Sequence, residues 1–194
     1  AGALEHDRIV QMVREKLVLP EGARSQRVHA TPVTEPRLKV VRKDTEQAHI
    51  CWGVAGLTAR DPDRFSAAVL DGVLGGGMSS RLFQQIREKR GLAYAVYSYQ
   101  LQYQDTGEFV IYAGTRPDNA VEVIGLIRDE IARVTESGIT TDELDRVRES
   151  LKGQMILALE STHSRMTRLG KAEVTDGELL SLDEIVERID AVTC

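Results

Sequence analysis

The sequence has few of the residues that hold small secreted proteins together. Two cysteines and four histidines occur in 194 residues. Cys51 and Cys194 cannot build a disulfide framework, and such scarcity favours a reducing compartment. Because Cys51 lies in an apolar run, we expect it to be a buried thiol, whereas Cys194 is expected to be exposed.

The histidines do not follow a metal-binding pattern. No two of His6, His29, His49 and His163 are four residues apart, the spacing that puts two imidazoles on one helix face. A hydrolytic zinc site needs about three protein ligands and an open coordination position. The sequence therefore predicts no metal site and no cofactor within this chain.

Long apolar runs and an excess of positive charge are also missing. No stretch approaches the roughly 18 apolar residues of a membrane-spanning helix, so no contact with a membrane is expected. The net charge of −5 argues against non-specific binding to nucleic acid. The chain starts without methionine, and we expect it to be a piece of a longer protein.

The apolar pattern predicts a helix and a linker ahead of one domain. Residues 4–18 carry apolar side chains at helical spacing, and Pro20, Pro32 and Pro36 mark an extended linker. We assign residues 1–36 to this helix and linker. The domain is placed at residues 37–194 and is expected to be truncated at its C-terminus. The apolar face of the helix is expected to pack on another part of the parent protein or on a second copy of the chain.

Within the domain, the predicted order is strand, strand, helix, helix, strand, strand, helix, helix, helix. The predicted strands are residues 38–42, 49–57, 93–103 and 108–114. The second is expected to be central in the sheet, because residues 50–55 are apolar on both faces. The predicted fold is α+β, with a mixed, mainly antiparallel sheet and helices packed on one face.

Capping residues predict where the helices begin. One helix is expected to start at Asp61-Pro62, and another at Pro117. Thr140 with Glu143 has the pattern of a capping box. The remaining helices are predicted over residues 80–90, with Ser79 or Ser80 as cap, and over residues 182–189.

Residues 74–99 join a three-glycine loop to a short amphipathic helix and an aromatic-rich strand. Gly75, Gly76 and Gly77 follow a predicted helix and lack the Gly-Lys-Ser/Thr of a phosphate loop, which favours a helix terminator. A second interpretation stays open. The backbone groups of three glycines are accessible, so the loop is also a candidate to lie against the main chain of a bound peptide.

Arg87 and Tyr94 lie seven residues apart across a predicted helix-to-strand turn. Guanidinium and phenol groups both donate hydrogen bonds to a carbonyl oxygen or an oxyanion. The alternative is that Arg87 is a solvated helix charge and Tyr94 a core aromatic, and spacing alone leaves both open. Arg81, six residues before Arg87, is expected to point elsewhere. Packing roles are expected for Tyr97, Tyr99 and Tyr103.

This stretch resembles the pitrilysin-type (M16) zinc peptidases, and it is close to the bacterial processing-protease-like members related to mitochondrial processing peptidase. The resemblance lies in Lys-Asp-Thr-Glu-Gln-Ala-His at residues 43–49 and in residues 74–83, 86–89 and 91–94, which read Leu-Gly-Gly-Gly-Met-Ser-Ser-Arg-Leu-Phe, Ile-Arg-Glu-Lys and Gly-Leu-Ala-Tyr. Residues 141–144 and 151–153 fit a later helix of the family.

The resemblance implies a protein of two homologous α+β lobes that close around a chamber. In the family, the first lobe carries a His-x-x-Glu-His zinc motif, and the second lobe contributes an arginine and a tyrosine whose spacing matches Arg87 and Tyr94. This chain has no such zinc motif. It therefore looks like the C-terminal lobe of a zinc-dependent metalloendopeptidase, a LuxS/MPP-like metallohydrolase lobe, with zinc expected only in the parent protein.

The resemblance leaves two alternatives open, a catalytically silent partner subunit and a peptide-binding or assembly scaffold. The expected partners are an N-terminal zinc-bearing lobe or subunit and a peptide substrate, with a homodimer as a further alternative. The expected location is the bacterial cytoplasm, with the mitochondrial matrix as the alternative.

Overall fold

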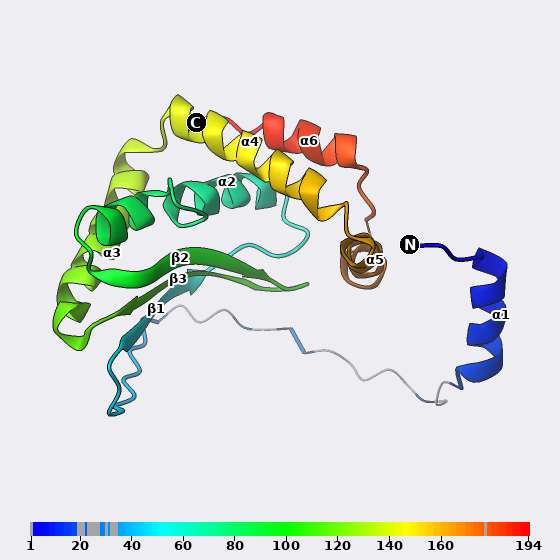
Figure 1. Ribbon diagram of the computed structural model, residues 1–194, viewed down its shortest axis with the longest axis horizontal. Coiled ribbons are helices and arrows are strands. Elements are labelled where there is room, and N and C mark those ends of the chain that lie inside the picture. The colour runs from blue at the N-terminus through cyan, green and yellow to red at the C-terminus, as the bar shows by residue number, and fades with distance from the viewer. Residues whose placement is uncertain (1, 19–21, 23–27, 30, 32–34, 177) are drawn as a thin grey trace.

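Three antiparallel strands form the base of the domain. A computed structural model describes residues 2–18, 22, 28–29, 31, 35–176 and 178–194. The strands are β1 (Ala48–Ala55), β2 (Ala93–Gln102) and β3 (Gly107–Thr115), and their order in the sheet is β1-β3-β2. Figure 1 shows the helices of the domain gathered on one side of this sheet. The predicted α+β class is confirmed, with a wholly antiparallel sheet.

Two layers of helices cover that side of the sheet (Figure 1). The layer next to the sheet contains α2 (Arg64–Leu74), the π-helix η1 (Phe83–Glu88) and α3 (Ala120–Ser137), which follows the 3₁₀ turn η2 (Pro117–Asn119). The outer layer contains α4 (Thr141–Ala158) and α6 (Leu182–Asp190), which pack on α2. Between α4 and α6 the chain forms α5 (Thr162–Lys171) and a second π-helix, η3 (Ala172–Asp176).

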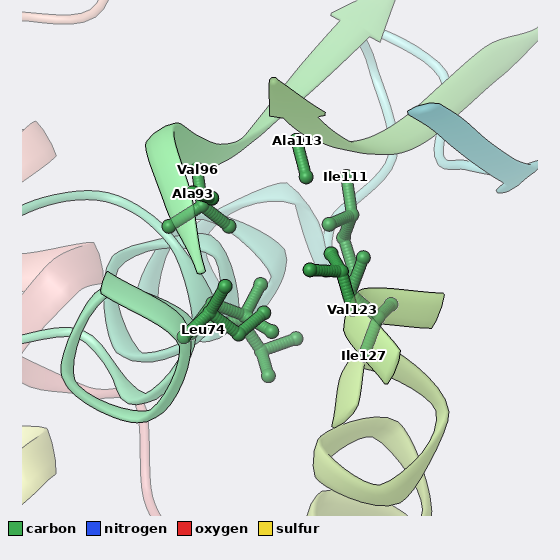
Figure 2. Close-up of a cluster of buried hydrophobic side chains, with 9 residues drawn as sticks. Leu74, Ala93, Val96, Ile111, Ala113, Val123 and Ile127 are labelled. Carbon is green, nitrogen blue, oxygen red and sulfur yellow. The ribbon is translucent and has the colours of Figure 1, made fainter. Parts of the chain in front are cut away.

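The main core lies between the sheet and the inner helices. Figure 2 shows side chains of β2 and β3 directed toward those of α2 and α3. Leu82 and Ile86 of the short helix are fully buried in this core. The labelled members of this cluster are Leu74, Ala93, Val96, Ile111, Ala113, Val123 and Ile127.

Helix α2 is buried on two sides, which fixes its position. Its residues Val69 and Val73 join Leu144 and Val147 of α4 in a second core. Gly72 permits this close approach, because a Cβ there would lie 2.4 Å from Cγ1 of Val147. The C-terminal part of α2 is therefore held between the sheet and the outer helices.

The strand predicted at Leu38–Arg42 is wrong. These residues have no regular structure, and Leu38 is 90% exposed. Their alternating apolar side chains resemble a strand, but a strand also needs a neighbour for its backbone hydrogen bonds. In the described part of the chain no strand pairs with them.

The apolar run of residues 50–55 suggested a central strand, but β1, which contains this run, is not central. β1 is at an edge of the sheet, and β3 is in the centre. Ile50 and Trp52 pack against the core, whereas Cys51 between them is an exposed free thiol. The prediction that Cys51 is buried is therefore wrong, because only one face of this sheet is covered by helices. Cys194 is exposed, as expected.

Local signals at the helix ends are mostly confirmed. Thr140 and Glu143 form the predicted capping box of α4. Helix α2 begins at Arg64 and not at Asp61-Pro62, because Asp63 is the N-cap residue. Asp61 instead accepts a hydrogen bond from the backbone N–H of Asp63, 2.9 Å between Oδ1 and N.

The N-terminal helix, α1 (His6–Lys16), is present as predicted and has no buried residue. Ile9, Met12 and Val13 on its apolar side are exposed. The predicted linker over residues 20–36 falls mostly on residues outside the described part of the chain. Among the helices described, none has the length and apolar character needed to cross a membrane.

Deleting residues 1–36 is expected to leave the domain folded. Because α1 buries nothing in this structure, its loss should shift Tm by less than about 4 °C, the equivalent of less than about 1 kcal/mol. Thermal unfolding followed by circular dichroism measures this. Loss of a cooperative transition would show that the domain boundary near Arg37 is misplaced.

Candidate functional site

The guanidinium of Arg87 is held by aromatic rings and by nothing else in the described part of the chain. Its Cζ lies 5.0 Å from the ring centroid of Phe83 and 5.4 Å from that of Tyr94. Stacking on a ring positions an arginine without using its N–H groups. No hydrogen bond or ion pair engages this guanidinium within the described residues, so its donors are available.

The sequence did not predict the π-helix that carries Arg87. Phe83–Glu88 is wound as a π-helix, in which the N–H of Lys89 bonds to the carbonyl of Gln84. π-Helical turns occur frequently at functional sites. Gly91 then has φ of +62°, a left-handed conformation that favours glycine, and it turns the chain into β2.

A β-bulge presents Tyr94 to solvent. Ala93 pairs with Thr115 and Ala95 with the adjacent Gly114, so Tyr94 is the extra residue. Ala93 and Val96 both face the core although they are three positions apart, which a regular strand does not allow. Tyr94 is 75% exposed, so the alternative that it is a core aromatic is wrong. The structure brings Arg87 and Tyr94 together, as their spacing suggested.

Arg81 points away from this pair, as expected. Its Nε and Nη2 donate to the two carboxylate oxygens of Glu143, at 2.6 and 2.7 Å. Nη2 also donates to the carbonyl of Gly138 at 3.1 Å. Arg81 therefore ties the glycine-loop region to the start of α4, which is a structural role.

The Arg81–Glu143 pair predicts a pH-dependent stability. Hydrogen bonds from Arg81, assisted by those from Thr140, lower the pKa of Glu143 from its ordinary 4.5 to about 2. A carboxylate with a lowered folded-state pKa contributes stability that is complete above its unfolded pKa and is lost as the pH falls toward the folded value. Arg81→Met is expected to cost about 1–2 kcal/mol at pH 6, after allowance for solvent screening, and half of that or less at pH 3.

Urea denaturation at the two pH values measures this difference. Lys89→Met is the matched control, because Lys89 is an exposed cation close by in the sequence. An equal loss of stability at pH 6 and pH 3 in the Arg81 variant would contradict the role of the ion pair.

The three glycines of the loop differ in their surroundings. A Cβ on Gly75 would lie 2.1 Å from the backbone nitrogen of Ser98, so this glycine is needed for close packing of α2 on β2. A Cβ on Gly76 would lie 2.7 Å from the Cα of Gly72 in α2, whereas a Cβ on Gly77 would meet nothing within 4 Å. Gly76 and Gly77 are exposed. The proposed contact with a peptide backbone stays a prediction for these two.

Tyrosines that the sequence assigned to packing lie on the open face of the sheet. Tyr97 is 44% exposed, and its ring centroid lies 4.9 Å from that of Tyr112 and 6.0 Å from that of Tyr99. His49 joins them through a 2.7 Å hydrogen bond between Nδ1 and the Tyr112 hydroxyl. We call His49, Tyr97, Tyr99 and Tyr112 the aromatic face. The alternation of side chains along β2 and β3 could have shown that these residues share one face of the sheet. It does not tell which face the helices cover.

The described residues do not offer a set of ligands for zinc. Among them, no three His, Cys, Asp or Glu side chains are placed to hold a metal ion. A zinc ion therefore does not fit the side chains of this part of the chain.

The sequence profile of the peptidase M16 inactive domain matches residues 1–151 of the chain. The chain belongs to this family. Over its whole length, this M16 inactive domain is 41% identical to a zinc protease of Streptomyces coelicolor, and it spans 44% of that relative's length. It thus represents less than half of the relative, and the resemblance seen in the central motif is confirmed.

Solved structures show the same fold. A peptidase M16 inactive domain from Pseudomonas fluorescens superposes with a TM-score of 0.70 and 29% identity, over 77% of this chain and 36% of that one. A protease from Helicobacter pylori superposes with a TM-score of 0.81 over 98% of this chain and 48% of that one. At 21% identity, this second likeness concerns the fold alone.

Proposed function

We propose that this M16 inactive domain is the C-terminal, substrate-binding lobe of a zinc-dependent metalloendopeptidase. In this proposal it supplies Arg87 and Tyr94 to a peptide-hydrolysis site whose zinc ligands lie on an N-terminal lobe or a separate subunit. The observation that carries the proposal is an arginine whose N–H donors bond to nothing among the described residues and whose guanidinium lies over the rings of Phe83 and the exposed Tyr94. The family and the zinc protease relative, which is more than twice as long, support it.

The chemistry of peptide hydrolysis suits such a pair. Attack on the peptide carbonyl places negative charge on its oxygen, and hydrogen-bond donors aimed at that oxygen lower the barrier. The Arg87 guanidinium provides a charged planar fork, and the Tyr94 hydroxyl provides a neutral donor. Because the described residues of this lobe offer no zinc site, the proposed site would be complete only when the two lobes close on the substrate.

Purified alone, the chain is expected to fold but to cleave no peptide. Metal analysis should find no stoichiometric zinc, and a fluorogenic peptide should remain intact over hours. The coding sequence tells whether the partner is a lobe or a subunit, since a His-x-x-Glu-His motif would lie in the same reading frame or in a neighbouring gene. Chelator-sensitive cleavage by the isolated chain would refute the proposal.

We also propose that the protein acts in the bacterial cytoplasm. Its relatives include zinc proteases of Streptomyces coelicolor and Bacillus subtilis. Cys51 and Cys194 are free exposed thiols, a state that a reducing compartment maintains.

A further inference from the structure

The aromatic face is ordered by the register of the three strands. On the open side of the sheet, Cys51, Tyr112 and Tyr97 form one cross-strand row, and the next row contains Val110 and Tyr99. The row on the other side of Tyr112 contains only small residues from β2 and β3, Ala95 and Gly114, with His49 at its edge. This row of small residues leaves room for the Tyr112 ring.

His49 and Gly114 fix the orientation of Tyr112. The Tyr112 ring leans over Gly114, where an added Cβ would lie 3.1 Å from the tyrosine hydroxyl oxygen. Its hydroxyl then meets Nδ1 of His49 at 2.7 Å, and the two ring centroids lie 6.0 Å apart. A ring that is already held in place loses little conformational entropy when a ligand packs on it.

The chemistry of this surface favours an aromatic ligand group. The three rows contain no aspartate, glutamate, lysine or arginine. Edge-to-face and offset contacts between rings add to simple burial of apolar area, whereas a charged group loses hydration there without gaining an ion pair. The first carboxylate on this side of the sheet is Glu108, in the row beyond Val110.

The aromatic face is continuous with the proposed catalytic contacts. Tyr94 and Tyr97 are both on β2, three residues apart. Three residues of a strand span about 10 Å, and an extended peptide covers the same distance in three residues. A substrate that lies extended along β2 with its scissile residue at Tyr94 would therefore place a side chain near Tyr97.

We propose that the aromatic face is a specificity subsite that accepts an aromatic side chain of the peptide substrate, three residues from the scissile bond. The proposal rests on the function proposed for Arg87 and Tyr94. Tyr97 and Tyr112 contact the side chain, and His49 acts as a positioning residue through the Tyr112 hydroxyl.

Kinetics of the assembled two-lobe enzyme test this subsite. Two sets of fluorogenic peptides are used, with phenylalanine or serine at the third position on each side of the scissile bond. On one of the two sides of the scissile bond, the phenylalanine peptide is expected to have a kcat/KM about tenfold or more above that of the serine peptide. Tyr97→Ser should abolish this preference, whereas replacing Tyr103, an exposed tyrosine just beyond β2, with serine should preserve it. Tyr112→Phe keeps the ring but removes its bond to His49, and it should weaken the preference several-fold.

The outcomes separate this inference from the proposed function. A preference that is absent, or that survives Tyr97→Ser, overturns the subsite, and a kcat loss in Tyr94→Phe would still support the catalytic pair. A direct binding measurement tests the subsite independently of catalysis. When the 194-residue chain is titrated with the phenylalanine peptide, the ring NMR signals of Tyr97 and Tyr112 should shift, and the serine peptide should not shift them. If the NMR signals shift but Tyr94→Phe has a normal kcat, the catalytic role of Arg87 and Tyr94 is refuted. The aromatic face would then remain a peptide-binding surface.

Discussion

Replacing Tyr94 with phenylalanine in the assembled two-lobe enzyme is expected to lower kcat by about 10²–10³-fold, the usual effect of removing one transition-state donor. KM should change little, because in the proposed role the hydroxyl acts mainly after charge develops on the carbonyl oxygen. The ring of Tyr94 remains, so its contact with Arg87 is kept. Steady-state kinetics with a peptide substrate measure the effect.

Arg87 should respond in the same way, and lysine should not replace it. A lysine supplies one compact charge and cannot reproduce the planar fork or its stacking between Phe83 and Tyr94. Lys89→Ala and Tyr103→Phe are the matched controls, since both residues are exposed and lie outside the pair. Arg81 is unsuitable as a control because its bonds to Glu143 make it structural. Near-normal kcat/KM in folded Arg87→Ala and Tyr94→Phe variants would show that the two residues have no catalytic role.

Gly75→Ala is expected to cost about 3 kcal/mol or more in the free energy of unfolding. A Cβ at this position would lie 2.1 Å from the nitrogen of Ser98 and 2.8 Å from the carbonyl carbon of Tyr97. Both contacts are backbone atoms of β2, which cannot rotate away as a side chain can. Overpacking of this kind commonly costs about 1–3 kcal/mol. Because the backbone of β2 cannot move aside, the cost for Gly75→Ala is expected at the upper end of this range.

Gly77→Ala is the matched control for the loop, because a Cβ there meets nothing within 4 Å. Its stability should stay within about 0.5 kcal/mol of the native value, as is usual for surface positions. If the loop lies against a peptide main chain, Gly77→Ala should still raise KM in the assembled enzyme. Equal urea denaturation midpoints for Gly75→Ala and the native chain would contradict the packing account.

Features set by neighbouring residues could be predicted from the sequence. The capping box of Thr140 and Glu143 is one example. The strands predicted over residues 93–103 and 108–114 are another, since a short turn joins them as β2 and β3. Both depend on contacts within a few positions of the chain. Arg87 and Tyr94 are likewise brought together by a single short turn, so their spacing was informative.

Features set by strand pairing could not be predicted in this way. The apolar run of residues 50–55 suits a central strand and an edge strand equally, and only the order β1-β3-β2 decides that Cys51 is exposed. The bulge at Tyr94 depends on the register against β3, and the aromatic face depends on all three strands. The π-helix of Arg87 has no sequence signal that separates it from an α-helix.

Addition of this chain to the purified zinc-bearing lobe tests the central claim most directly. Peptide hydrolysis is measured for the zinc-bearing lobe alone, with the native chain, and with an Arg87→Ala, Tyr94→Phe chain that binds the lobe equally well. The account predicts that cleavage appears with the native chain and falls by at least about 10²-fold with the double variant. Equal cleavage with the native and variant chains, or full activity of the zinc-bearing lobe alone, would contradict it.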